Sequence, residues 1–265
     1  MRNNLPFTFA VGRFLMRVRP APLASFVKRL LGIRRREIAT NEGRFWVDPA
    51  SYVGLELAET GFHEPDTLEA IHLILRPGDT FVDVGANEGY FTVVASRIVG
   101  PTGRVLAVEP QQRLERVLAK NLAANLCTNV VVIQTAISNS SGIATLHLAP
   151  DMNNSASGLA VATHYRVATQ PTPLMTLTEL LAQVPDSRPV VKMDIEGFEY
   201  EAILGSEAVF RTGIVRTLIV EPHDHLLRRR HLDIEALPRF LRACGYEQTA
   251  RFEGRVWARP GTLSL

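Results

Sequence analysis

Apolar runs alternate with amphipathic segments along the chain from residue 80 onward. The short Val/Ile/Leu-rich runs predict strands, because they are bounded by glycine, proline or asparagine. The intervening segments repeat apolar residues at helical spacing, which predicts helices. Core strands are expected at 80–85, 104–109, 129–137, 189–195 and 214–221. Near-continuous apolar strands separated by amphipathic helices are typical of a parallel sheet buried on both faces.

The segments between these strands complete the pattern. Helices are expected at 87–99, 110–125 and 174–184. A short edge strand is expected at 143–148, followed by a polar loop over 151–160. Such a loop carries acceptor specificity, acts as a lid, or is a plain connection.

The two ends of the chain differ from this alternating middle. Residues 246–259 alternate and turn near Gly254, which predicts a closing hairpin with antiparallel character. Residues 41–75 predict a short strand and a helix. We therefore expect an α/β fold whose sheet is mostly parallel with the last strand antiparallel. The main domain would span 76–265, behind an N-terminal basic, helical extension over 1–75.

Charge is distributed unevenly along the chain. The first 36 residues contain nine Arg/Lys and no Asp/Glu, and because the whole chain carries +2, the remainder carries −7. An acidic body argues against a nucleic-acid partner. Residues 1–40 also place Phe26, Leu30 and Ile33 on one helical side among arginines. A membrane-surface contact and a helix packed on the body are both open interpretations.

Cysteine usage and hydropathy indicate the compartment. Cys127 and Cys244 stand in apolar surroundings, and no CxxC motif or Cys/His pair suggests zinc. Buried free thiols are typical of a reducing compartment. No apolar run approaches the ~20 residues of a spanning helix. The sequence predicts a cytoplasmic protein, and a homodimer is one open option for its assembly.

The stretch FVDVGANEGYFT (81–92) passes from an apolar strand through two glycines into a helix. Open α/β sheets bind nucleotides at such turns. Gly85 and Gly89 form neither a Walker loop nor the GxGxxG dinucleotide fingerprint. Asp83 would repel a pyrophosphate, but it suits a cofactor with a positive end, and S-adenosyl-L-methionine carries a sulfonium and an ammonium group. The glycines would let the chain pass close to that cofactor.

Glu109 ends the second expected strand. A carboxylate there can accept hydrogen bonds from both ribose hydroxyls of such a cofactor. Without Glu109, the glycine motif could be only a tight strand-to-helix turn. An NAD-linked oxidoreductase is a rival interpretation, but the missing GxGxxG and the placement of Asp83 count against it.

Four motifs in order resemble the FkbM family of class I S-adenosylmethionine-dependent methyltransferases. They are VDVGANEGYFT, GPTGRVLAVEP, TAISNSSGIATL and VVKMDIEGFEYEAILG. The resemblance covers most of the chain, including the ETGFHEPDTLEAI segment before the first motif. It implies a Rossmann-like, seven-stranded sheet and methyl transfer mostly to hydroxyl oxygens. It also implies that the donor contacts Asp83, Gly85, Asn87, Gly89 and Glu109, with the turn that holds Ala136 beside the adenine.

Candidate catalytic groups follow the fourth and fifth core strands. The motif KMDIEG places Lys192, Asp194 and Glu196 at alternate positions, so they can share one side of a strand. His223 follows the next strand and is the first candidate for a general base, because neutral imidazole is available near pH 7. Asp194 is the second candidate and is also expected to contact the donor. Lys192 needs an acidic partner in an apolar strand, and the pair could serve catalysis or only shape the site.

The same region offers weak candidates for metal ligands. Asp194, Glu196, Glu221 and His223 are of types that bind divalent cations. They come from two strands, and no single loop gives a ligand pattern, so no metal is expected. The sequence thus predicts an S-adenosylmethionine-dependent methyltransferase acting on a hydroxyl of a sugar, glycan or other natural product. A non-catalytic scaffold that keeps the fold for binding or membrane docking is the alternative.

Overall fold

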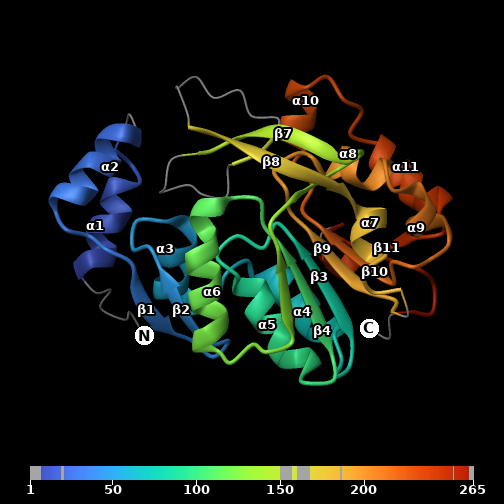
Figure 1. Ribbon diagram of the computed structural model, residues 1–265, viewed down its shortest axis with the longest axis horizontal. Coiled ribbons are helices and arrows are strands. Elements are labelled where there is room, and N and C mark those ends of the chain that lie inside the picture. Colours follow the sequence, from blue (N-terminus) through green and yellow to red (C-terminus); the bar gives the residue numbers. More distant parts are fainter. Residues whose placement is uncertain are drawn as a thin grey trace.

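The structure is a computed structural model, and it describes residues 7–18, 21–149, 157–159, 168–185, 187–252 and 254–262. Apart from residues 157–159, the polar loop predicted at 151–160 lies outside this part of the chain. Helices enclose a central sheet, and a smaller sheet and a pair of N-terminal helices are added to this core (Figure 1).

The central sheet has seven strands within the described residues, in the order β11-β12-β10-β9-β3-β4-β5. The parallel strands are β3 (Thr80–Val84), β4 (Arg104–Val108), β5 (Val130–Ile133), β9 (Val190–Met193) and β10 (Thr217–Val220). The closing hairpin consists of β11 (Glu247–Gln248) and β12 (Val256–Ala258), and β12 runs antiparallel to β10. This confirms the predicted α/β fold with a mostly parallel sheet and an antiparallel closing strand.

Alternate strand residues face opposite layers of helices. Phe81 and Val105 belong to one apolar cluster, whereas Val82 and Leu106 belong to another. The first cluster includes residues of α3 (Tyr52–Thr60), α4 (Pro65–Ile74), α5 (Tyr90–Val99) and α6 (Glu115–Ala124). The second includes residues of α7 (Leu177–Leu181), α8 (Glu199–Leu204), α9 (Glu207–Arg211) and α11 (Ala236–Ala243). Because both faces are covered, the strands are apolar on both sides.

The N-terminal region adds two helices and a hairpin. These elements are α1 (Phe7–Leu15), α2 (Ala21–Leu30), β1 (Arg36–Ala39) and β2 (Arg44–Val47). The two helices pack together around Leu15 and Ala24 at one end of the molecule (Figure 1). Phe45 of the hairpin shares an apolar cluster with Phe81 of the central sheet. The domain division after residue 75 stays a prediction.

A second sheet stands beside the carboxyl ends of the central strands. Among the described residues its order is β6 (Ala136–Ser138), β8 (Thr169–Thr176) and β7 (Gly142–His147). The single strand expected at 129–137 is therefore two strands that belong to different sheets. The edge strand expected at 143–148 is present as β7.

The helix expected from Leu174 begins later, as α7 at Leu177. Thr176 ends β8 and caps this helix, because its hydroxyl accepts the Glu179 N–H over 3.1 Å. The Glu179 carboxylate in turn accepts the Thr176 N–H over 2.8 Å. The predicted start at Leu174 is thus wrong by three residues. Other helical elements are η1 (Gln112–Leu114), α10 (Asp224–Arg229) and η3 (Ala250–Phe252).

Candidate functional site

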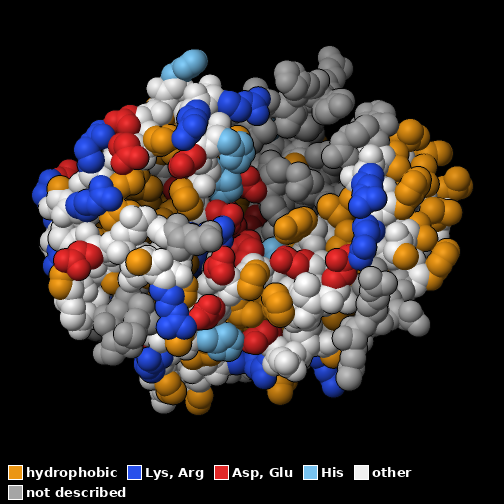
Figure 2. All heavy atoms as spheres, turned by 180° about the vertical axis from the view of Figure 1, so that it is seen from behind, with side chains coloured by type: hydrophobic (Ala, Val, Ile, Leu, Met, Phe, Trp, Pro, Cys, Tyr) orange, Lys and Arg blue, Asp and Glu red, His pale blue; other side chains and the backbone are white. Residues whose placement is uncertain are grey.

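Two adjoining pockets open at the carboxyl ends of the central strands. The first, here the apolar pocket, measures about 590 Å³ with its open mouth, and its lining includes Val108, Glu109, Ala136, Ile137, Leu146 and Phe198. The second, here the acidic pocket, is lined by residues that include His63, Glu64, Lys192, Glu221 and His223. Both pockets share a wall of Gly85, Asn87, Asp194 and Glu196. Figure 2 shows acidic side chains gathered in a hollow near the middle of one face.

The turn after β3 forms part of this shared wall. Gly85 has a φ of +84°, and a Cβ there would lie 1.9 Å from the backbone oxygen of Asp194. The Gly85 N–H donates to the Val108 carbonyl over 3.0 Å. Lys192 Nζ donates to the Gly85 carbonyl over 3.1 Å. Glycine is required here because any side chain would displace the neighbouring backbone.

The Glu109 carboxylate is held at the end of β4 by two backbone amides. The Asn87 N–H donates to Oε2 over 2.8 Å, and the Gln111 N–H donates to Oε1 over 2.9 Å. Burial raises the pKa of Glu109, and these hydrogen bonds oppose the rise. The Gln111 side chain is a third hydrogen-bond partner of this carboxylate, which has about four acceptor positions in all. The carboxylate therefore keeps acceptor capacity for a hydroxyl donor of a molecule in the apolar pocket.

Asp83 and Gly89 line neither of these two pockets. Asp83 is fully buried in β3, where Oδ2 accepts the Thr92 hydroxyl over 2.6 Å and Oδ1 lies 3.4 Å from Lys192 Nζ. Gly89 caps α5 with a φ of +88°, and a Cβ there would lie 2.4 Å from Leu118 Cδ1. The structure thus places both residues outside the pocket linings: Asp83 offsets the charge of Lys192, and Gly89 begins α5.

Lys192 is a buried cation between two acids. Its Nζ lies 3.4 Å from Asp83 Oδ1 and 3.6 Å from Asp194 Oδ2. Burial alone would lower the pKa of Lys192, but the charges of Asp83 and Asp194 outweigh it and raise the pKa above its ordinary value. The raised pKa favours the protonated ammonium, which donates to the Gly85 carbonyl and offsets the charges of Asp83 and Asp194.

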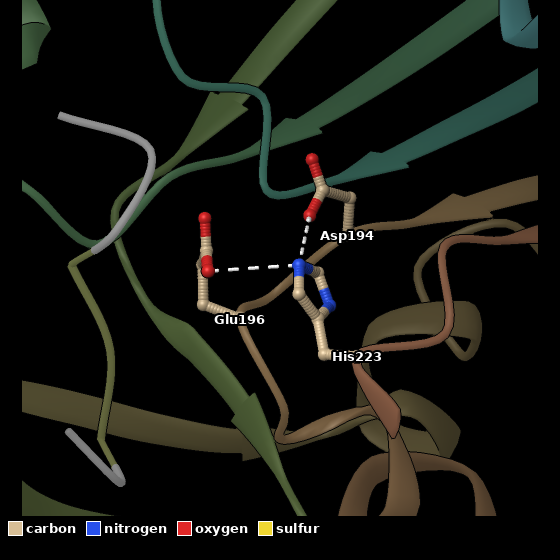
Figure 3. A group of neighbouring side chains, drawn as sticks. All are labelled: Asp194, Glu196 and His223. Carbon is tan, nitrogen blue, oxygen red and sulfur yellow. Dashed lines mark ion pairs between the residues drawn. The ribbon is translucent and has the colours of Figure 1, made fainter. Parts of the chain in front are cut away.

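Three predicted residues converge where the pockets meet (Figure 3). His223 Nε2 lies 3.5 Å from Glu196 Oε2 and 3.8 Å from Asp194 Oδ1. On the other side of the ring, Nδ1 lies 3.1 Å from Glu199 Oε1. The same carboxylate accepts the Ile195 N–H over 2.7 Å. Glu199 thus fixes the ring with Nε2 toward the pocket acids.

The surrounding acids set the charge of His223. Burial lowers the pKa of His223, but Glu199, Asp194 and Glu196 raise it to about 9. Burial raises the pKa of Glu196 to about 8, with His223 opposing the rise and the other acids adding to it. His223 is therefore a cation at neutral pH in this environment. This differs from the neutral imidazole expected from the sequence, and the cause is the acids around the ring.

Two sets of described side chains have the geometry to hold a divalent cation. Ligand atoms of Asp194, Glu196 and His223 lie within 4.8 Å of one another, and so do those of Glu64, Asp194 and Glu221. The pKa of Glu221 is raised by burial and by the charges of Glu64 and Asp194. Any positive charge would reduce the repulsion among these carboxylates, whether it is a metal ion, a sulfonium or an ammonium. The arrangement therefore favours a cation without selecting a metal.

Glu199 is the candidate that the sequence analysis did not single out. It is 2% exposed, in the first turn of α8. The available signal was an acid three residues after Glu196 at the start of an expected helix. Its contact with His223 arises only when β10 places the following loop beside α8, so the spacing along the chain does not reveal it.

Comparison with known proteins gives one family match. The family model described as the methyltransferase FkbM domain matches residues 83–247. No curated protein matches.

Several solved structures match parts of the chain at low identity and with TM-scores below 0.5. Methyltransferase FkbM from Methylobacillus flagellatus KT is 15% identical over 77% of this chain and 52% of its own, with a TM-score of 0.43. A SAM-dependent O-methyltransferase from Thermotoga maritima is 13% identical over 80% of this chain and 71% of its own, with a TM-score of 0.41. Fibrillarin from Aeropyrum pernix, in complex with natively bound S-adenosyl-L-methionine, is 13% identical over 70% of this chain and 66% of its own, with a TM-score of 0.35.

The chain spans about half the length of the Methylobacillus structure. Its sheet and its family match define the class of the S-adenosylmethionine-dependent methyltransferases with a Rossmann-like fold. Because the matched region covers more than half of the sequence, the chain belongs to the FkbM methyltransferase family.

Proposed function

We propose that this protein transfers a methyl group from S-adenosylmethionine to a hydroxyl of a sugar, glycan or other natural product. The observation that carries the proposal is the wall of Gly85, Asn87, Asp194 and Glu196, which borders both pockets. Molecules bound in the two pockets would meet across this wall. Family membership supports methyl transfer, and the hydroxyl acceptor rests on the family resemblance alone.

The apolar pocket suits the donor. Val108, Ile137 and Phe198 offer apolar surface to an adenine ring, and Glu109 offers acceptors to the ribose hydroxyls. Asp194 supplies negative charge for the cationic end. When bound, S-adenosylmethionine supplies an electrophilic methyl group. Orientation of the two reactants can lower such a barrier by up to ~7–11 kcal/mol in ideal cases.

We propose that His223 Nε2 acts as the general base that takes the proton of the acceptor hydroxyl. Asp194 is the second candidate for this role. Glu199 holds the ring through Nδ1, which leaves Nε2 facing the acidic pocket. The ring must first lose its own proton. A positive charge arriving beside Asp194 and Glu196 repels the imidazolium and lowers the pKa of His223. A base in this position contributes typically ~10²–10⁴-fold to the rate.

Calorimetry with S-adenosylmethionine, its demethylated product and NAD tests the donor assignment. We expect binding of the first two and none of NAD. Glu109→Gln should weaken donor binding at least about tenfold, because an amide offers one acceptor oxygen instead of two. Glu115→Gln, an exposed acid of α6, is the matched control and should bind as the wild type does.

Other outcomes discriminate the alternatives. Binding of NAD without the methyl donor would favour the oxidoreductase. Donor binding without label transfer from methyl-labelled donor to any of a panel of hydroxylated acceptors would favour the non-catalytic scaffold.

We propose that the reaction needs no metal. The acids of the two cation-holding sets would then interact with the cationic donor and with His223 in place of a metal ion. Activity that survives chelation supports this assignment. Loss of activity on chelation, restored by Mg²⁺, would assign a metal to Asp194, Glu196 and His223 instead.

We also propose a reducing, cytoplasmic location and no nucleic-acid partner. Cys127 and Cys244 are both free thiols, which supports the location. The net charge of −7 on the chain after residue 36 supports the absence of a nucleic-acid partner.

A further inference from the structure

The two N-terminal helices turn large apolar side chains outward. Phe7 and Phe14 of α1 are 82% and 67% exposed, and Phe26 and Leu30 of α2 are 58% and 76% exposed. Phe7 and Phe14 are two turns apart, and Phe26 and Leu30 are about one turn apart, so each pair shares a face of its helix. Leu23 and Leu31 are also exposed. Figure 2 shows hydrophobic side chains gathered at the end of the molecule that Figure 1 assigns to these helices.

These side chains are not needed for the packing of the helices themselves. The inner side of the pair already has its own cluster, formed by Leu15, Ala24 and Ala50. Isolated exposed apolar residues are ordinary, but a group on one end of a molecule marks an interaction surface. The outward face is therefore available to a partner outside the described chain.

Basic side chains accompany the apolar face. Arg17, Arg29 and Arg34 are exposed, and none of them forms an ion pair within the described residues. The first 36 residues contain no acid. The partner must therefore be both apolar and negatively charged.

We propose that this N-terminal surface, made of Phe7, Phe14, Leu23, Phe26, Leu30 and Leu31 with Arg17, Arg29 and Arg34, docks on an anionic lipid bilayer. Phenylalanine and leucine suit the boundary between headgroups and acyl chains, and arginine suits lipid phosphates. No helix in the described part of the chain is long and apolar enough to cross a membrane. The helices would therefore lie in the interface.

A second copy of the chain fits this surface less well. Pairing the surface with itself would bring the arginines of both copies together, with no acid in residues 1–36 to oppose them. None of the named residues lines the apolar or acidic pocket. Docking and donor binding are therefore separable.

Co-sedimentation with vesicles of equal parts phosphatidylcholine and phosphatidylglycerol tests the proposal. We expect the full chain to pellet with these vesicles at about 50 mM salt, to be largely released at about 500 mM salt, and not to pellet with phosphatidylcholine alone. Phe26→Ser/Leu30→Ser should weaken binding at least about tenfold because the apolar contribution is lost. Ile143→Ser, at an 80% exposed position on β7, should bind as the wild type does.

Charge is tested in the same assay. Arg29→Glu/Arg34→Glu should lose binding at least about tenfold. Arg104→Glu/Arg116→Glu changes the net charge equally at exposed positions elsewhere and should retain it. Unchanged unfolding midpoints in all four variants would show that folding is intact.

Three results would overturn the proposal. The first is wild-type protein that stays in the supernatant with anionic vesicles. The second is equal loss in the control variants. The third is a concentration-dependent dimer that Phe26→Ser/Leu30→Ser abolishes, without vesicle binding by the wild type, which would make the surface an interface between copies.

Discussion

Glu199 shows how one buried acid changes the chemistry of a neighbouring residue. Near neutral pH an isolated histidine is largely neutral. In this site Glu199 bonds Nδ1 of His223, and Asp194 and Glu196 lie on the Nε2 side. The ring is thereby oriented, but it is also charged. Asp194, Glu196 and His223 could be singled out from KMDIEG and from the residues after the next core strand, whereas the charge of the ring required the three-dimensional packing.

We expect His223 to titrate with a pKa of about 9. Glu199→Gln should lower this value, because it removes the acid bonded to Nδ1. Ring resonances followed by NMR across pH measure the shift, with Glu207→Gln, an exposed acid of α9, as the control. A wild-type His223 that titrates near 6.5 would contradict the assignment.

The raised pKa of His223 also affects stability. Because the folded-state pKa lies above the unfolded value, the contribution of protonated His223 is fully present below pH ~6.5 and is lost as pH rises through about 9. The stability difference between wild type and Glu199→Gln should therefore shrink over this window. Denaturant unfolding at several pH values measures it, and a difference that grows with pH would exclude this cause.

Gly85 illustrates a residue whose identity follows from backbone geometry. Gly85→Ala should lower the free energy of unfolding by more than Gly245→Ala does. Both glycines have positive φ, +84° and +83°, but only at position 85 would the new Cβ meet another backbone, 1.9 Å from the Asp194 oxygen. The control should cost about 1 kcal/mol, and the contact at position 85 should add at least ~1–3 kcal/mol. If urea unfolding gave the same loss of unfolding free energy for both variants, the turn would have moved to accommodate the new methyl group.

At the scale of elements, hydrophobic patterning located the strands well and their ends less well. The apolar runs at β3, β4, β9 and β10 were recognisable because both faces of each strand are buried. The run at 129–137 hid a change of sheet between β5 and β6, which depends on the distant strand β8. β8 was not among the expected strands. It is the middle strand of its sheet, and its Pro171 and Pro173 lie opposite β7, outside the stretch 174–176 that pairs with β6.

The start of α7 is set by a cap that sequence inspection overlooked. Thr176→Ala should lower the free energy of unfolding by about 1 kcal/mol, because the Glu179 N–H loses its acceptor. Thr178→Ala, at an exposed position inside the same helix, makes the same chemical change without touching the cap. Guanidinium unfolding compares the two variants. Similar costs for both would show that the capping box adds nothing.

At the scale of the whole molecule, the fold brings together groups that are far apart in the chain. Glu109 follows β4, Asp194 follows β9 and His223 follows β10, and parallel pairing sets all three at one edge of the sheet. Parallel topology made this convergence predictable from the sequence. The direction of each side chain was not predictable, as Asp83 shows: it stands in β3 but lines neither pocket, and its carboxylate contacts Thr92 and Lys192 instead.

The surplus of carboxylates along the shared wall bears on product release in the proposed reaction. Methyl transfer turns a sulfonium into a neutral thioether, while Asp194 and Glu196 keep their places. The attraction that draws in a fresh donor is therefore weaker for the spent one, which keeps its ammonium group but has lost the sulfonium charge. Such a site binds the methyl donor more tightly than the demethylated product. The product therefore competes less with the donor in the next turnover.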